Sequence, residues 1–147
     1  MSSVNAPYGF RASYHQSGNI RPKLYTIATG YAVDIFAGDP VKLVDAGTIQ
    51  LGTSDGTRSG TVDGVLLLGI FAGVSYIDPT GKPCNSPYWP ASIAATEIQA
   101  WVFDDPETLF TTQYTNPSPG TTVQTAVGEG VDWTVASPGG VVATGLS

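Results

Sequence analysis

The chain has 147 residues, a net charge of −6 and only 12% charged residues. This length is enough for one domain with a modest core, and a hydrophobic share of 41% excludes wholesale disorder. An acidic chain lacks the clustered cations that nucleic-acid binding needs, so we expect no nucleic-acid partner. Low charge together with 18 Gly and 11 Pro favours short strands and tight turns over long surface helices.

The first 25 residues are mildly basic and rich in aromatic side chains. They contain three cations and no acid, and the aromatic residues show no clear period among Pro and Gly. We interpret residues 1–25 as an extended N-terminal arm that lies on another surface. The alternative is a first strand and loop of the same domain. The candidate contact residues in this arm are Tyr8, Phe10, Arg11, Tyr14, Arg21 and Lys23.

Residues 26–114 are predicted to form an all-β core domain, a small barrel or sandwich of short antiparallel strands. Residues 26–35 are β-prone, and the alternation in 41–43 and 49–51 predicts a hairpin across Asp45-Ala46-Gly47. Asp55-Gly56 and Asp63-Gly64 are typical hairpin dipeptides. The nearly apolar run 65–76 indicates a strand that is buried on both faces.

Turn signals organise the next part of the chain. Asp78-Pro79-Thr80-Gly81 has the type I turn pattern, and three Pro residues in 82–91 predict a loop there. Alternation in 98–103 predicts a strand with one aliphatic and one aromatic face. Asp105-Pro106-Glu107 is typical of a single helical turn. The aromatic side chains of this region are candidates for oligomer or ligand contacts, with core packing as the alternative: Tyr88, Trp89, Trp101 and Phe103.

Residues 115–147 differ in composition from the core domain. After a Pro-rich linker they consist mainly of Thr, Val and Gly, with Trp133 as the only aromatic side chain. We interpret them as a smaller C-terminal β extension.

Residues that would carry chemistry are scarce. His15 and Cys84 are single, so the chain lacks the several His or Cys ligands of a zinc site, and we expect no metal and no cofactor. Asp104 and Asp105 are adjacent, which on a strand sends their side chains to opposite faces and suits a turn better than a glycosidase pair. We therefore predict that the protein is not an enzyme. The longest apolar run spans about 10 residues, whereas a membrane helix needs about 20, so we expect no membrane partner.

Several short runs resemble a family of tailed-bacteriophage capsid decoration proteins, also called cement or head-stabilising proteins. They are NAPYGFR (5–11), YTIATGY (25–31), GDPVKL (38–43), LGIFAGV (68–74), YWPA (88–91) and FDDP (103–106), with a looser likeness at AVGEG (126–130). The resemblance implies a small β-domain on the outer capsid surface, often a trimer, whose arm grips the major capsid protein.

The expected function is therefore that of a virion structural protein that stabilises a phage capsid by non-covalent binding to the major capsid protein. We expect assembly in the host cytoplasm and self-association, as a homotrimer or alternatively a dimer. The alternative function is a carbohydrate- or receptor-binding virion surface module, such as a head fibre or tail component.

Overall fold

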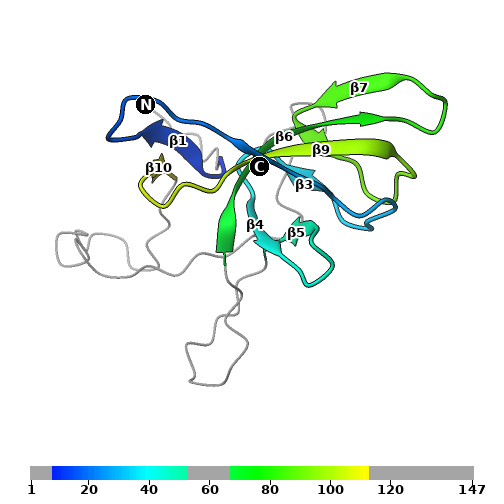
Figure 1. Ribbon diagram of the computed structural model, residues 1–147, viewed down its shortest axis with the longest axis horizontal. Coiled ribbons are helices and arrows are strands. Elements are labelled where there is room, and N and C mark those ends of the chain that lie inside the picture. Colours follow the sequence, from blue (N-terminus) through cyan, green and yellow to red (C-terminus); the bar gives the residue numbers. More distant parts are fainter. Residues whose placement is uncertain (1–7, 53–66, 113–147) are drawn as a thin grey trace, which may run out of the picture.

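A computed structural model describes residues 8–52 and 67–112, which form ten strands and no helix (Figure 1). The predicted all-β class is confirmed. The strands are β1 (Arg11–Tyr14), β2 (Lys23–Tyr25), β3 (Ile35–Phe36), β4 (Pro40–Leu43), β5 (Ile49–Leu51), β6 (Leu67–Ile77), β7 (Pro83–Ser86), β8 (Tyr88–Trp89), β9 (Thr96–Phe103) and β10 (Leu109–Thr111). The hairpin dipeptides of 53–66 and the C-terminal extension at 115–147 lie outside the described residues.

Strand β6 is the centre of a six-stranded antiparallel sheet. The sheet has the order β2-β9-β6-β4-β5, and β7 also pairs with β6. Strand β9 follows one edge of β6, while β4 and β7 share the other: Ile70 faces Pro40 of β4, and Val74 faces Ser86 of β7. The middle of β6 is buried on both faces, as predicted from the apolar run, because the consecutive residues Ile70 and Phe71 point to opposite faces and are both buried.

The sheet curls without closing into a barrel. A single parallel bridge joins Ile27, two residues after β2, to Ile49 of β5, and the Ile49 N–H donates to the Thr26 carbonyl over 2.9 Å. The two ends of the sheet therefore approach each other, but no continuous ladder links them. Two small sheets, β1-β10 and β3-β8, complete the described part of this sandwich-like fold.

The core lies on the concave side of this curled sheet. Trp89 is fully buried and meets Tyr76 edge to face, with 5.6 Å between the ring centroids. Aliphatic side chains from most of the strands surround this pair, because inward positions alternate along each strand. The buried cluster consists of Ile27, Ile35, Val41, Ile49, Phe71, Val74, Tyr76, Trp89, Ala95, Ala100 and Val102.

Two predicted turns are confirmed. The Gly81 N–H donates to the Asp78 carbonyl over 3.0 Å, and the Asp78 carboxylate accepts from the Thr80 N–H over 2.8 Å, which closes the β6-β7 hairpin. The β4-β5 hairpin turns at residues 45–47 as expected, with Gly47 at φ +76°.

Three local predictions need correction. Residues 82–91 are not a loop, because β7 pairs with β6 through one edge only and Pro83 stands at its first position, where a missing N–H is tolerated. Residues 26–35 contain a bridge and a turn instead of a strand, until β3 begins at Ile35. The predicted helical turn at 105–107 is a β-turn, in which the Thr108 N–H donates to the Asp105 carbonyl.

The extended-arm interpretation is wrong for residues 8–25, which fold onto the rest of the chain. β1 pairs with β10 and β2 pairs with β9. The Phe10 N–H donates to the Gly38 carbonyl over 2.9 Å, and a Cβ at Gly38 would come within 3.2 Å of the Gly9 Cα. Gly38 thus lets the backbone of the leading segment approach closely. Residues 1–7 lie outside the described part, and the domain boundaries near 25 and 114 stay predictions.

Candidate functional site

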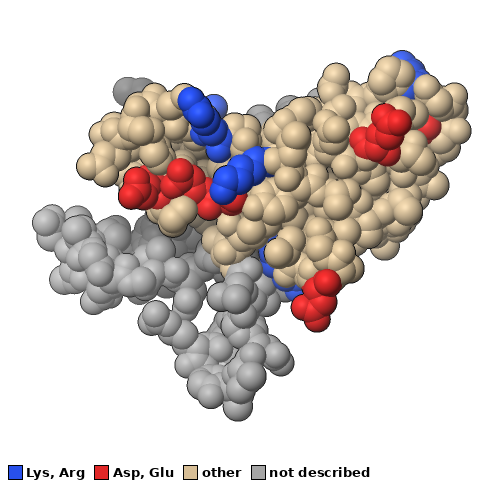
Figure 2. Space-filling view, in the orientation of Figure 1, with Lys and Arg blue, Asp and Glu red and all other residues tan. Residues whose placement is uncertain are grey.

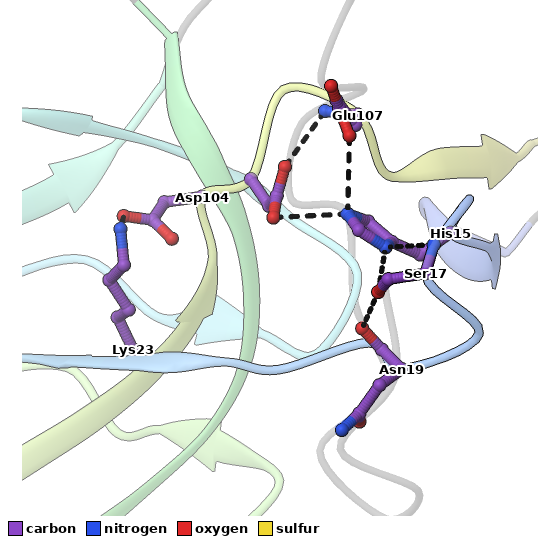
Figure 3. Close-up of polar contacts among 7 residues, drawn as sticks. His15, Ser17, Asn19, Lys23, Asp104 and Glu107 are labelled. Atoms are coloured by element: carbon purple, nitrogen blue, oxygen red, sulfur yellow. Dashed lines mark hydrogen bonds and ion pairs between the residues drawn. The ribbon is translucent and has the colours of Figure 1, made fainter.

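The candidate site is the junction between the two-stranded β1-β10 ribbon and the main sheet. The segment that contains β1 and β2 runs antiparallel to the segment that contains β9 and β10. β1 pairs with β10 and β2 pairs with β9, and the backbone ladder is interrupted between these two pairs. In this interruption, residues 15–22 lie opposite residues 104–108. Side-chain hydrogen bonds replace the backbone ladder there (Figure 3). Figure 2 shows cations and acids side by side near this ribbon.

Asp104 holds one side of the junction. Its Oδ2 accepts from the Lys23 Nζ over 2.9 Å and from the Tyr25 hydroxyl over 2.8 Å. The side chain is only 8% exposed. Burial raises the pKa of Asp104, but the hydrogen bonds from Lys23 and Tyr25 outweigh it, so the net pKa is lowered. The hydrogen bond to Asp104 raises the pKa of Lys23 and that of Tyr25.

The charge on Asp104 should therefore stabilise the fold in a defined pH range. A folded-state pKa below the ordinary 3.8 means that this contribution is complete above pH 3.8 and is lost as the pH falls through the folded value. We expect the free energy of unfolding in urea to drop below pH 3.8, and Asp104→Asn to reduce that drop. Asp45→Asn, in the exposed β4-β5 turn, is the control. An unchanged acid dependence in Asp104→Asn would contradict this assignment.

His15 holds the other side of the junction and is 9% exposed. Its Nε2 lies 3.1 Å from Asp105 Oδ2 and 4.0 Å from Glu107 Oε2. Its Nδ1 accepts from the Ser17 N–H over 3.1 Å and lies 2.6 Å from the Ser17 Oγ. Asp105 is itself fixed, because its Oδ1 accepts from the Glu107 N–H over 3.0 Å.

The three acids of 104–107 do not form one pair of facing carboxylates. Asp104 contacts Lys23 and Tyr25, whereas Asp105 and Glu107 face His15. Figure 3 shows Asp104 beside Lys23, apart from Glu107 and His15. Cys84 is on β7, where its sulfur is nearest to Asp78 and Lys82, so it is not paired with His15. Within residues 8–52 and 67–112, no group of three His, Cys, Asp or Glu is arranged to hold a metal ion.

The structure divides the predicted arm residues into two groups. Phe10 packs inward against Phe110, with 6.5 Å between the ring centroids, and Lys23 pairs with Asp104. The other four have exposed side chains: Tyr8, Arg11, Tyr14 and Arg21. Arg11 lies 5.5 Å from the centroid of the Tyr8 ring.

The four aromatic candidates of the second half do not form one surface. Trp89 is buried in the core, where its Nε1–H donates to the Tyr31 carbonyl over 3.4 Å. Tyr88 stacks on Phe36, and Phe103 contacts Phe110. Trp101 is partly exposed and pairs with Leu24 of β2. The contact role stays a prediction for the three that are not in the core.

Sequence reasoning missed the contacts of His15. The partner Asp105 is 90 residues away, and nothing in the pattern around either residue indicates the other. The only local signal is the His-x-Ser spacing of His15 and Ser17, which allows the two side chains to meet within one turn.

Comparisons with known proteins give no relative: no family model, curated protein or solved structure matches the chain. No helix among the described residues is long and apolar enough to cross a membrane.

Proposed function

We propose that this protein is a virion structural protein that decorates and stabilises the outer surface of a phage capsid. In this proposal it binds the major capsid protein non-covalently and assembles in the host cytoplasm as a homotrimer, with a dimer as the alternative. It needs no catalysis, metal or cofactor for this role. The sequence runs that resemble capsid decoration proteins support the proposal.

The observation that carries the proposal furthest is a pair of exposed arginines, Arg11 on the β1-β10 ribbon and Arg21 in the segment between β1 and β2. Arg11 and Arg21 form no ion pair within the described residues, and Tyr14 is 56% exposed. Tyr14 faces Leu109 across the ribbon, and Leu109 is 59% exposed. Aromatic and arginine side chains on a surface are typical anchors for a protein partner.

The backbone of the ribbon offers a second kind of contact. Among the described residues β1 pairs only with β10, and no described strand lies along its other edge. An extended segment of a partner adds to such an edge as a further strand. A homotrimer that engages several neighbouring sites on the lattice at once compensates for a modest affinity at each one.

Removing the charges of Arg11 and Arg21 tests this proposal. We expect the double variant Arg11→Ala with Arg21→Ala to bind undecorated, expanded heads about tenfold more weakly than the wild type in co-sedimentation, because lost cations weaken complementary contacts. Lys82→Ala removes an exposed cation from the distant β6-β7 hairpin and serves as the control.

Equal binding of both variants would contradict the role of the ribbon, and absence of wild-type binding would contradict the function. Point variants are preferable to deleting residues 1–24, because that deletion removes β1 and two of the three residues of β2.

The alternative function, a carbohydrate- or receptor-binding virion module, now depends mainly on Trp101. Its cross-strand neighbours are Leu24, which is 56% exposed, and Gly73, which has no side chain. Such a flat apolar surface suits a sugar ring. Glycan-array binding that Trp101→Ala abolishes would favour this alternative over capsid decoration.

A further inference from the structure

The hydrogen bonds of His15 define which ring nitrogen carries the proton. The Ser17 N–H donates to Nδ1, so Nδ1 has a free electron pair and no proton. The proton of the neutral ring is therefore on Nε2, where it donates to the Asp105 carboxylate over 3.1 Å. The Ser17 hydroxyl, 2.6 Å from Nδ1, shares this single electron pair with the Ser17 N–H and is the closer of the two donors.

Hydrogen bonds therefore connect the Ser17 hydroxyl to one nitrogen of His15 and the Asp105 carboxylate to the other. Figure 3 shows the Ser17 and His15 side chains. A nucleophile within reach of a base, with that base oriented by a third group, is the arrangement that activates hydroxyl nucleophiles. The ring nitrogens are exchanged relative to the usual triad, because the serine is on Nδ1 and the acid on Nε2. The Ser17 oxygen is 3.5 Å from the Asn19 carbonyl, a much weaker alternative acceptor.

A nucleophilic serine has to be accessible to its substrate, and its base is best shielded from water. His15 is buried, which shields it from competing water, while Ser17 is exposed and accessible to a reagent. Asp105 is fixed by the Glu107 N–H and so holds the ring in place. Asp105 thus acts as a positioning residue.

We propose that Ser17 is an activated nucleophile that accepts an acyl group from carboxylic esters. The Ser17 Oγ forms a bond to the carbonyl carbon, and its proton passes to His15 Nδ1. The bond from that carbon to the leaving oxygen breaks, and the proton then passes to the departing alkoxide. The products are an acyl-serine and an alcohol. This inference is independent of capsid binding.

Acylation by p-nitrophenyl acetate tests the proposal on the full chain. Mass spectrometry with fragmentation distinguishes Ser17 from Ser13, an exposed serine on β1 that serves as an internal control. We expect Ser17 to be acylated at least about 100-fold faster than Ser13, the lower end of what general-base assistance supplies. Ser17→Ala should remove this fast phase.

Two carboxylate variants separate activation from a purely structural role. Asp105→Asn keeps the size of the side chain but favours a proton on Nδ1, so we expect at least about tenfold slower acylation of Ser17. Glu107→Gln, whose carboxylate lies 4.0 Å from Nε2, should retain most of the rate. Nitrogen chemical shifts of His15 in NMR should show the Nε2-protonated tautomer in the wild type and its loss in Asp105→Asn.

Acylation of Ser17 at the rate of Ser13 would overturn the proposal. So would an Asp105→Asn variant that is folded by circular dichroism and acylated as fast as the wild type. In either case the His15 hydrogen bonds would serve only to join the ribbon to the sheet.

Discussion

Replacing Trp89 by alanine is expected to lower the free energy of unfolding by about 3–5 kcal/mol. Trp89 is fully buried, its ring meets Tyr76, and its Nε1–H donates to the Tyr31 carbonyl. Alanine removes these contacts and leaves a cavity where strands β3, β6 and β8 meet. Domains of this size have a total stability of about 5–15 kcal/mol, so this loss is a large fraction of the total.

Urea unfolding of two variants, Trp89→Phe and Trp89→Ala, tests this prediction even if Trp89→Ala is too unstable to measure. Trp89→Phe retains most of the volume and should lose less stability than Trp89→Ala. Trp101→Ala is the matched control, since Trp101 is partly exposed on the outer side of β9. A larger loss in Trp101→Ala than in Trp89→Ala would show that the core is assigned to the wrong face of the sheet.

The second large effect is expected at Gly69, where β6 passes β9. A Cβ at this position would overlap the Phe103 carbonyl oxygen and come within 2.9 Å of the Asp104 Cα. Both are backbone atoms, so the strands themselves have to separate. We expect Gly69→Ala to lower the free energy of unfolding by about 3 kcal/mol. It should also disturb the adjacent hydrogen bonds of Asp104.

Gly47→Ala is the control for this effect. Gly47 has φ +76°, and a Cβ there would meet nothing within 4 Å beyond its own chain neighbours. Alanine at this position therefore encounters only backbone strain, of about 1 kcal/mol. Equal losses in the two variants would contradict the close approach of β6 and β9. Chemical shifts of Lys23 and Tyr25 report directly on the junction in Gly69→Ala.

The sequence predicts correctly those turns and strands that depend on residues close together in the chain. Asp78 and Gly81 identified the β6-β7 turn, because Asp and Gly satisfy backbone requirements within four residues. The alternation of 98–103 located β9, and the apolar run of 65–76 located the central strand.

Contacts between distant residues explain what sequence reasoning missed. Phe10 packs on Phe110, and no pattern in either segment indicates that they meet, so the sequence predicts an arm where the structure has a folded ribbon. The Pro residues of 82–91 exclude a central strand but permit an edge strand, which needs only one row of backbone bonds.

The candidate site was predicted only in part for the same reason. Composition located the cations of the leading segment, but the carboxylates that receive Lys23 and His15 come from residues 104 and 105. A residue type alone does not show whether its charge is free for a partner. Within residues 8–52 and 67–112, Arg11 and Arg21 form no ion pair, whereas Lys23 is paired with Asp104.

We propose above all that this protein binds and stabilises a capsid shell. The most direct measurement adds the purified wild-type protein to undecorated, expanded heads and records both co-sedimentation and the temperature at which the heads rupture. We expect saturable binding in a fixed ratio to the major capsid protein, together with a higher rupture temperature. Heads that neither retain the protein nor gain resistance to heat would contradict it.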